Sequence, residues 1–245
     1  GVNAKILNNP KAIKKSIQQE ARNIRYELLS NYCKKNSLNF LLTAHHKNDQ
    51  IETFLIRLSR GSGIRGLSAM QEKTKIGDKI YLIRPFLKIF KSDLVSLAKK
   101  YFVKPVNDPS NKDTKFLRTK IRKITKYLEL SGINLENINK SIENINSANL
   151  ILNTIELEAE KKCVKRYRHK KIISMKKLKK YPDEILIKVI SKTLKDTSKN
   201  YYPPRAKKIQ NLIKIIDKRT LHNYILGGCT ISCDKTSNLE VSKCA

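Results

Sequence analysis

The pattern of apolar and polar positions begins with a strand followed directly by a helix. A short apolar run at 38–42, bounded by polar residues, has the length expected of a buried strand. A helix over about 48–58 follows it, with Ile51, Leu55 and Leu58 spaced four and three residues apart as a core face. This part of the chain therefore predicts a strand, a polar corner and a helix N-terminus.

The same periodicities predict further elements on both sides of this corner. An apolar strand at 79–89 is ended by Pro85, because proline cannot donate a hydrogen bond to a strand ladder. The segment 107–111 is a turn signal. Amphipathic patterns predict helices at 10–36, at 92–101, around Arg118, at 134–168, at 183–196 and at 205–217, with short strands at 224–241.

The change of pattern near Ser131-Gly132 predicts a domain boundary. We expect an α/β domain at 1–132. We expect a mainly helical domain at 133–245, with a short β-containing tail. At 28.3 kDa and 40% hydrophobic residues the chain can bury one or two modest cores.

The densest group of reactive side chains lies at the polar corner. His45 and Asp49 are four residues apart and Asp49 and Glu52 three apart, so they can share one helix face. In open α/β sheets, ligands bind outside the carboxyl ends of strands, where helix N-termini offer free amides. First-turn carboxylates could simply favour the helix dipole, and the spacing does not suit a structural transition-metal site. Because His45 and His46 are two of only four histidines, we favour a functional site.

Three glycines, Gly61, Gly63 and Gly66, follow the same helix. They match the dinucleotide fingerprint literally, but that motif needs a strand before the glycines, and here a helix precedes them. We interpret the segment as a loop that ends the helix, with Arg60 and Arg65 as phosphate-binding forks. A flexible helix cap with solvated arginines is the alternative.

Several motifs stand in a fixed order along the chain: Glu20-Ala21-Arg22-x-x-Arg25-Tyr26, His45-His46-x-x-Asp49-Gln50-x-Glu52-Thr53, Arg57-x-x-Arg60-Gly61-Ser62-Gly63-x-x-Gly66-Leu67, Arg84-Pro85-Phe86-Leu87, Asn107-Asp108-Pro109-Ser110-Asn111, Phe116-Leu117-Arg118-x-x-Ile121-Arg122 and Leu226-Gly227-Gly228-Cys229. Together they resemble the tRNA(Ile)-lysidine synthases, members of the PP-loop ATP pyrophosphatase group. Ordered motifs at a family's approximate spacing are far more specific than a single match.

The resemblance implies an α/β fold for 1–132, namely the C-terminal part of a parallel-sheet PP-loop domain of the adenine nucleotide alpha hydrolase type. It implies a cytoplasmic ligase that joins lysine to C2 of the wobble cytidine of tRNA(Ile) with the CAU anticodon. The reaction would form lysidine through an adenylated tRNA, with ATP and Mg²⁺ as cofactors. The expected partners are that tRNA and free lysine. No membrane contact is expected, and a homodimer is possible.

The resemblance also implies roles for the candidate residues. The expected catalytic residues are His45, His46, Asp49 and Glu52. The carboxylates could bind the lysine ammonium group, hold Mg²⁺ or act as a general base, while the histidines could line the nucleotide pocket or carry a proton. ATP or phosphate binding is expected of Arg60, Gly61, Gly63, Arg65 and Arg118. Binding of tRNA is expected of Arg22, Arg25, Arg122, Lys165, Arg166 and Arg168, and no resident metal site is expected.

One motif of the family, its Ser-Gly-Gly-x-Asp-Ser loop, is not found in this sequence, and residue 1 is Gly rather than Met. We therefore expect the chain to begin within a longer protein. A fragment, one half of a split reading frame and a decayed gene product all remain open. In the alternative reading, the chain is a catalytically inactive fragment that only binds tRNA. A PP-loop thiolase is disfavoured because no Cys-x-x-Cys pair is present.

The charge of the chain agrees with an RNA partner. Lys and Arg number 52 against 21 Asp and Glu, a formal net charge of +31, which attracts polyanions. Part of this excess could reflect an AT-rich genome, because Lys, Ile and Asn are abundant throughout. The five cysteines are odd in number and mostly scattered, so a disulfide framework is not expected and a reducing compartment is the default.

Overall fold

The computed structural model describes residues 3–9, 17–77, 79–101, 117–199, 203–218, 221, 223–234 and 238–244. They belong to two compact units, 1–147 and 148–245, which divide inside the long helix α6 (Leu135–Cys163). We expected a boundary near Ser131-Gly132 instead. These residues form the turn before α6, where Gly132 has a φ of +84°.

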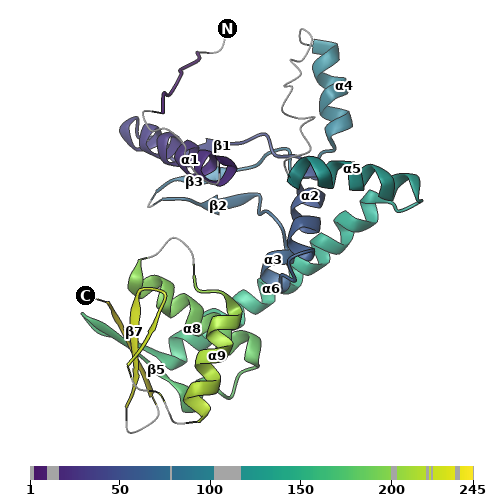
Figure 1. The fold of residues 1–245 in the computed structure, drawn as a ribbon. Helices are drawn as coiled ribbons and strands as arrows, with labels where there is room; N and C mark the ends of the chain where they lie inside the picture. Colours follow the sequence, from purple (N-terminus) through teal and green to yellow (C-terminus); the bar gives the residue numbers. More distant parts are fainter. Residues whose placement is uncertain are drawn as a thin grey trace. The chain divides into compact units, whose positions relative to one another are not determined.

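The first unit contains a three-stranded sheet in the order β1, β3, β2 (Figure 1). Strand β1 (Phe40–Leu42) runs parallel to β3 (Tyr81–Ile83), while β2 (Lys73–Lys75) is antiparallel to β3. The expected α/β class is confirmed. Strand β2 was not predicted, because a Lys-Thr-Lys sequence has no apolar alternation to reveal it.

Among the described strands, β1 lies at an edge of its sheet, and the apolar side chains in it and just before it are largely exposed. Leu38, Phe40 and Leu42 are 46%, 57% and 63% exposed, whereas Leu82 on the central strand β3 is 2% exposed. The expectation of a buried strand at 38–42 is therefore wrong for these side chains. Periodicity alone predicts that a segment is a strand, but it does not predict whether other strands or helices cover its side chains.

The first unit also contains helices, the first of which packs against strand β1. They are α1 (Ile17–Lys35), α2 (Lys47–Leu58), the single turn α3 (Ile64–Leu67), α4 (Lys91–Tyr101), α5 (Leu117–Leu130) and the first part of α6. In α2, Ile51 is fully buried as expected, but Leu58 is half exposed at the C-terminal end. The turn predicted at 107–111 lies outside the described residues.

The second unit is built on a five-stranded antiparallel sheet in the order β4, β5, β8, β7, β6. Its elements after α6 are β4 (Val164–Arg166), β5 (Lys170–Ser174), α7 (Met175–Leu178), α8 (Asp183–Ser198), α9 (Ala206–Asp217), β6 (Tyr224–Leu226), β7 (Cys229–Cys233) and β8 (Asn238–Lys243). Ile173, Val189, Leu212 and Leu239 are fully buried in the core that the sheet forms with α8 and α9.

The helix expected over 134–168 ends earlier, at Cys163. Residues 164–174 form a β-hairpin, so this part of the expectation is wrong. The physical reason is long-range pairing: Ile173 stands opposite Val164 on one side and Leu239 on the other, and its side chain is fully buried. The predicted C-terminal strands therefore join this hairpin in one sheet rather than forming a separate tail.

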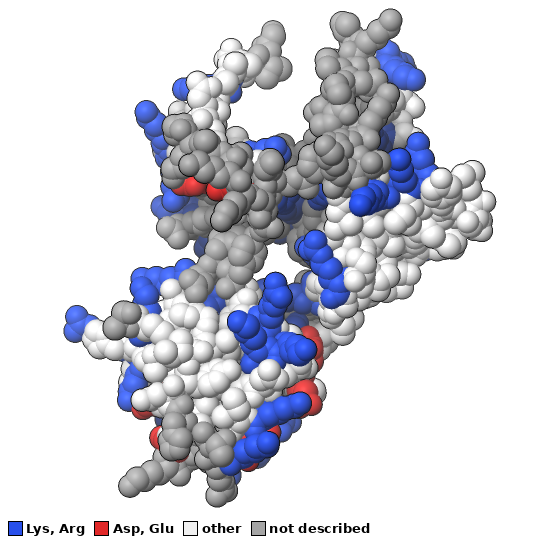
Figure 2. Space-filling view, viewed as in Figure 1, with Lys and Arg blue, Asp and Glu red and all other residues white. Residues whose placement is uncertain are grey.

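Positive charge dominates the surface of both units. In Figure 2, Lys and Arg side chains cover far more of the visible surface than Asp and Glu. All five cysteines are free thiols. Among the described residues, no helix is long and apolar enough to cross a membrane.

Candidate functional site

The polar corner predicted from the sequence forms the N-terminus of α2. His46 is the N-cap: its backbone N–H donates to Asp49 Oδ2 at 3.0 Å, and its Nδ1 accepts from the Asp49 N–H at 3.4 Å. Burial lowers the pKa of His46, so its ring is neutral at pH 7 and can accept this hydrogen bond. These contacts fix the start of the helix and the position of Asp49.

Asp49 and Glu52, here called the acidic pair, are buried beside one arginine from α5. Arg122 Nε donates to Glu52 Oε1 at 2.6 Å, and Arg122 Nη2 lies 3.9 Å from Asp49 Oδ1. Glu52 Oε2 is buried and has no hydrogen-bond partner among the described residues. Within the described part of the chain, Arg122 is the one lysine or arginine in ion-pair contact with these two carboxylates. The formal charge of this group of three side chains is −1, which favours a cationic ligand.

A cavity of about 300 Å³, here called the arginine cavity, lies next to this corner. Its walls come from α1, from the segment after β1 and from α5. The lining residues are Arg22, Arg25, Tyr26, Leu29, Thr43, Ala44, His45 and Arg118. None of the described residues that line this cavity is a carboxylate, so its three guanidinium groups favour an anion such as a phosphate.

His45 lines the arginine cavity as a neutral ring. Burial lowers its pKa to about 4, and the nearby Arg84, Arg22 and Arg118 act in the same direction, against the opposing effect of Asp49. Thr43 Oγ1 lies 2.9 Å from His45 Nδ1 and holds the ring in place. The adjacent residues His45 and His46 therefore connect a cationic cavity to the acidic pair.

The glycine loop lies at the other end of α2. Arg60, Gly61, Gly63 and Arg65 follow the C-terminus of a helix about 18 Å long, and none of them lines the arginine cavity. Their predicted phosphate-binding role stays a prediction. Gly61 has a φ of +64°, as expected for a glycine that ends a helix.

Two residues of α2 hold residues 66–70, at the end of this loop and just after it, against the helix, and the sequence reasoning assigned them no role. Arg57 Nη1 donates to the carbonyl oxygens of Gly66 at 2.6 Å and Ala69 at 2.9 Å. The Gln50 side chain accepts from the Met70 N–H at 2.7 Å and donates to the Met70 carbonyl at 2.8 Å. Both residues belong to the motifs described above, and this was the one feature of the sequence that could have indicated a role for them.

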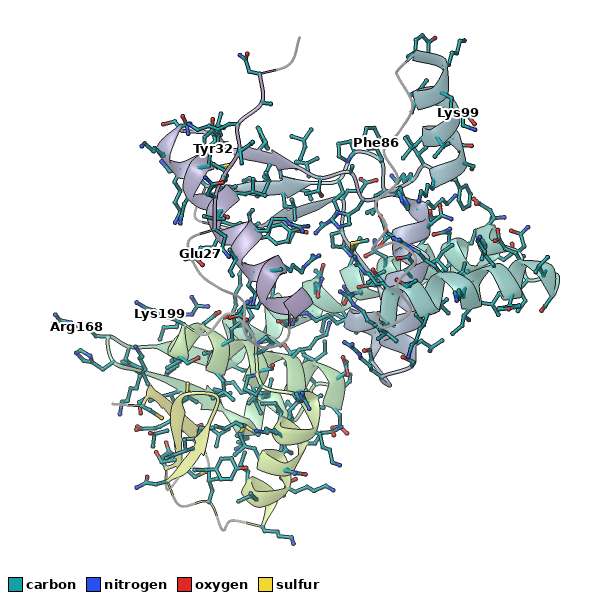
Figure 3. The ribbon with its side chains drawn as sticks, turned by 45° about the horizontal axis from the view of Figure 1, so that its top comes forward. Glu27, Tyr32, Phe86, Lys99, Arg168 and Lys199 are labelled. Atoms are coloured by element: carbon teal, nitrogen blue, oxygen red, sulfur yellow. The ribbon has the colours of Figure 1, made fainter. Side chains whose placement is uncertain are left out.

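The residues predicted to bind tRNA fall into three places. Arg22 and Arg25 line the arginine cavity together with Arg118, and Arg122 binds the acidic pair. The others belong to the second unit, where Lys165 and Arg166 lie on β4 and Arg168 lies in the following turn (Figure 3). Arg166 forms an ion pair with Glu160, a residue that also binds Lys192.

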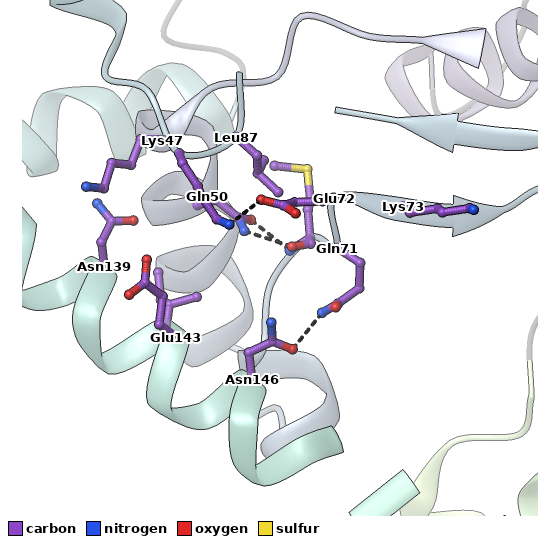
Figure 4. A pocket seen from close by; sticks show the side chains of 12 residues that line it. Lys47, Gln50, Gln71, Glu72, Lys73, Leu87, Asn139, Glu143 and Asn146 are labelled. Atoms are coloured by element: carbon purple, nitrogen blue, oxygen red, sulfur yellow. Dashed lines mark hydrogen bonds and ion pairs between the residues drawn. The ribbon is translucent and has the colours of Figure 1, made fainter. Parts of the chain in front are cut away.

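A second cavity of about 350 Å³ lies between α2, the segment before β2 and the first part of α6 (Figure 4). Its polar groups largely satisfy one another. Gln71 Nε2 donates to Asn146 Oδ1 at 2.9 Å, and Lys88 Nζ lies 2.8 Å from Glu72 Oε1. Within the described ranges, no group of three or more His, Cys, Asp and Glu side chains is placed to hold a metal ion.

Comparison with known proteins places this site in a family. A profile of the PP-loop domain matches residues 2–128, about half of the chain. The chain belongs to the PP-loop family. The matched range contains the arginine cavity, the acidic pair and the glycine loop of this PP-loop protein.

Curated relatives of the PP-loop protein carry the name tRNA(Ile)-lysidine synthase. The protein of Wolbachia pipientis wMel is 35% identical over 229 residues, covering 92% of this chain and 53% of the relative. The protein of Anaplasma marginale (strain St. Maries) is 30% identical over 246 residues, covering 98% and 52%. The chain thus spans about half the length of these relatives, and the resemblance read from the motifs is confirmed.

We predict that Gly66→Ala destabilises the glycine loop. A Cβ at Gly66 would lie 2.6 Å from Ser62 Cβ, so the loop must shift, and we expect the free energy of unfolding to fall by about 1–3 kcal/mol. Gly63→Ala is the matched control, because its Cβ would meet no atom within 4 Å and its φ of −72° suits alanine. Equal urea midpoints for the two variants would contradict the prediction.

We predict that His45 makes stability depend on pH. Because its pKa is lowered from 6.5 to about 4 in the folded protein, the unfolded chain binds the proton more strongly between these values, so stability falls as the pH drops through this range. For this half-buried ring, screening leaves an expected loss of about 1 kcal/mol between pH 7 and pH 5. Urea unfolding at both pH values should show a smaller loss in His45→Gln, and identical losses would refute the assignment.

Proposed function

We propose that this PP-loop protein acts in the ATP-dependent ligation of lysine to C2 of the wobble cytidine of tRNA(Ile) with the CAU anticodon, in the cytoplasm. The observation that carries the proposal is the arginine cavity lying directly beside a buried acidic pair with net negative charge. One site suits the phosphates of ATP, and the other suits the ammonium group of lysine. The names of the curated relatives support tRNA(Ile) as the RNA.

The first step would activate the cytidine. The C2 oxygen attacks the α-phosphorus of ATP, a new oxygen–phosphorus bond forms, and pyrophosphate leaves with the electron pair of the broken bond. Negative charge increases on the transferred phosphate and on the leaving group. Arg22, Arg25 and Arg118 would stabilise this charge from the walls of their cavity. A neutral His45 can donate or accept a hydrogen bond there without repelling the arginines.

The second step would transfer lysine. The amine of lysine attacks C2 of the adenylated base, a carbon–nitrogen bond forms, and AMP leaves with the original C2 oxygen. The ammonium group must lose a proton before it can attack. The acidic pair would bind the ammonium group, and Glu52 Oε2, which has no hydrogen-bond partner in the described part of the chain, would accept the proton.

The residues of this site fit Mg²⁺ only when ATP is bound together with it. Mg²⁺ is usually bound by one or two carboxylates together with substrate phosphates and water. The acidic pair supplies that number of carboxylates, although Arg122 already occupies Glu52 Oε1. When bound, Mg²⁺ would neutralise charge on the pyrophosphate. A homodimer stays a prediction.

The test measures incorporation of radiolabelled lysine into a tRNA(Ile) transcript with the CAU anticodon, in the presence of ATP and Mg²⁺. The chain is assayed alone and together with the part of the Wolbachia pipientis relative that it does not match. We expect ATP-dependent incorporation in at least one of these two reactions. No incorporation in either one, with tRNA binding retained, would contradict the ligase proposal and favour a protein that only binds tRNA.

A further inference from the structure

Helix α5 has two faces with different chemistry. The inner face carries Arg118, which lines the arginine cavity, Arg122, which binds the acidic pair, and the buried Ile121 and Thr125. The remaining positions include Lys120, Lys123, Ile124 and Tyr127, which we call the outer stripe. Their spacing of three, four and seven residues from Lys120 places them along one side of the helix.

The outer stripe is exposed. Tyr127 is 68% and Ile124 47% exposed, and both lysines are exposed as well. Within the described residues, neither Lys120 nor Lys123 forms an ion pair. The one acidic residue in the sequence of α5 is Glu129, against five basic residues. The helix therefore presents uncompensated positive charge beside an accessible aromatic ring.

We propose that the outer stripe binds RNA, with Lys120 and Lys123 contacting backbone phosphates and Tyr127 stacking on an unpaired base. Non-helical RNA is bound by this combination, because every base has a face that stacks on an aromatic ring while cations follow the backbone. The cores of protein interfaces are instead depleted in lysine. The inference rests on the proposed function, since it gives the tRNA a contact on the helix that also carries Arg118 and Arg122.

The experiment measures the affinity of the 245-residue chain for a fluorescent tRNA(Ile) transcript with the CAU anticodon, by anisotropy at several salt concentrations. We expect Tyr127→Ala to bind about 5-fold to 100-fold more weakly, because stacking of one base is lost. Tyr127→Phe keeps the aromatic face and should bind within twofold of the wild type. The folded state of each variant is verified by circular dichroism.

The lysines are tested through the salt dependence of binding. Replacing Lys120 and Lys123 by serine should reduce the slope of log K against log salt by about 1.4–1.8, because two phosphate contacts are removed. The control replaces Lys99 and Lys100 on α4 by serine, which removes the same charge elsewhere in the same unit (Figure 3). The control should retain the wild-type slope.

Three results would overturn the inference. If Tyr127→Ala binds tRNA as the wild type does, no base stacks on the stripe. If the α4 control loses as much slope as the stripe variant, the lysines act only through net charge. If Tyr127→Ala changes the oligomeric state but not tRNA affinity, the stripe is a protein interface. All three leave wild-type tRNA binding intact, whereas a wild type that binds no tRNA contradicts the proposed function itself.

Discussion

Arg122→Ala is expected to lower the free energy of unfolding by about 3 kcal/mol. The substitution leaves Asp49 and Glu52 buried without their cation, and removing one partner of a buried ion pair costs about 3–5 kcal/mol. The lower end applies because the Arg122 side chain is itself 36% exposed. Urea unfolding at pH 7 measures the effect.

The control for this prediction is Lys123→Ala, the adjacent and exposed residue of the same helix. We expect its stability to remain within about 0.5 kcal/mol of the wild type. Adding Glu52→Gln to Arg122→Ala should recover part of the loss, since it removes one of the unpaired charges. If Arg122→Ala is as stable as Lys123→Ala, Arg122 does not neutralise the acidic pair.

Glu52→Gln is expected to lower lysine incorporation at least about 100-fold, the contribution typical of a positioned general base. The amide keeps the size of the side chain but can neither accept the proton of the attacking amine nor attract its positive charge. Affinity for tRNA should stay within twofold. The radiolabelled lysine assay described above measures the change in rate.

Glu143→Gln is the matched control, because Glu143 is an exposed glutamate of the same unit that lines the second cavity. It should incorporate lysine at the wild-type rate. A Glu52→Gln variant that remains folded and incorporates lysine within threefold of the wild type would show that Glu52 is not the base.

The sequence predicted the parts of the site that depend on local spacing. The strand at 40–42, helix α2 and its polar N-terminus follow from periodicity and from the histidine pair, and the His46–Asp49 capping box is a contact over three residues. The grouping of Arg22, Arg25 and Arg118 in one cavity did not follow from spacing, because it joins helices that are far apart along the chain.

The features that the sequence did not predict depend on distant partners. The hairpin at 164–174 forms because β5 pairs with β8, about 70 residues later, and a helical reading of the same residues was locally reasonable. Likewise, the hydrogen bonds that Arg57 and Gln50 form with Gly66 and Met70 exist only once the chain after the glycine loop turns back onto α2. Sequence spacing contains no information on such contacts.

The central claim is that the arginine cavity serves the ATP step and the acidic pair serves the lysine step. The most direct measurement follows AMP transfer from α-³²P-labelled ATP to tRNA and incorporation of labelled lysine in parallel reactions. The account predicts that Arg118→Gln loses both signals, whereas Glu52→Gln accumulates adenylated tRNA without incorporating lysine. Loss of AMP transfer in Glu52→Gln equal to that in Arg118→Gln would contradict the division of the site.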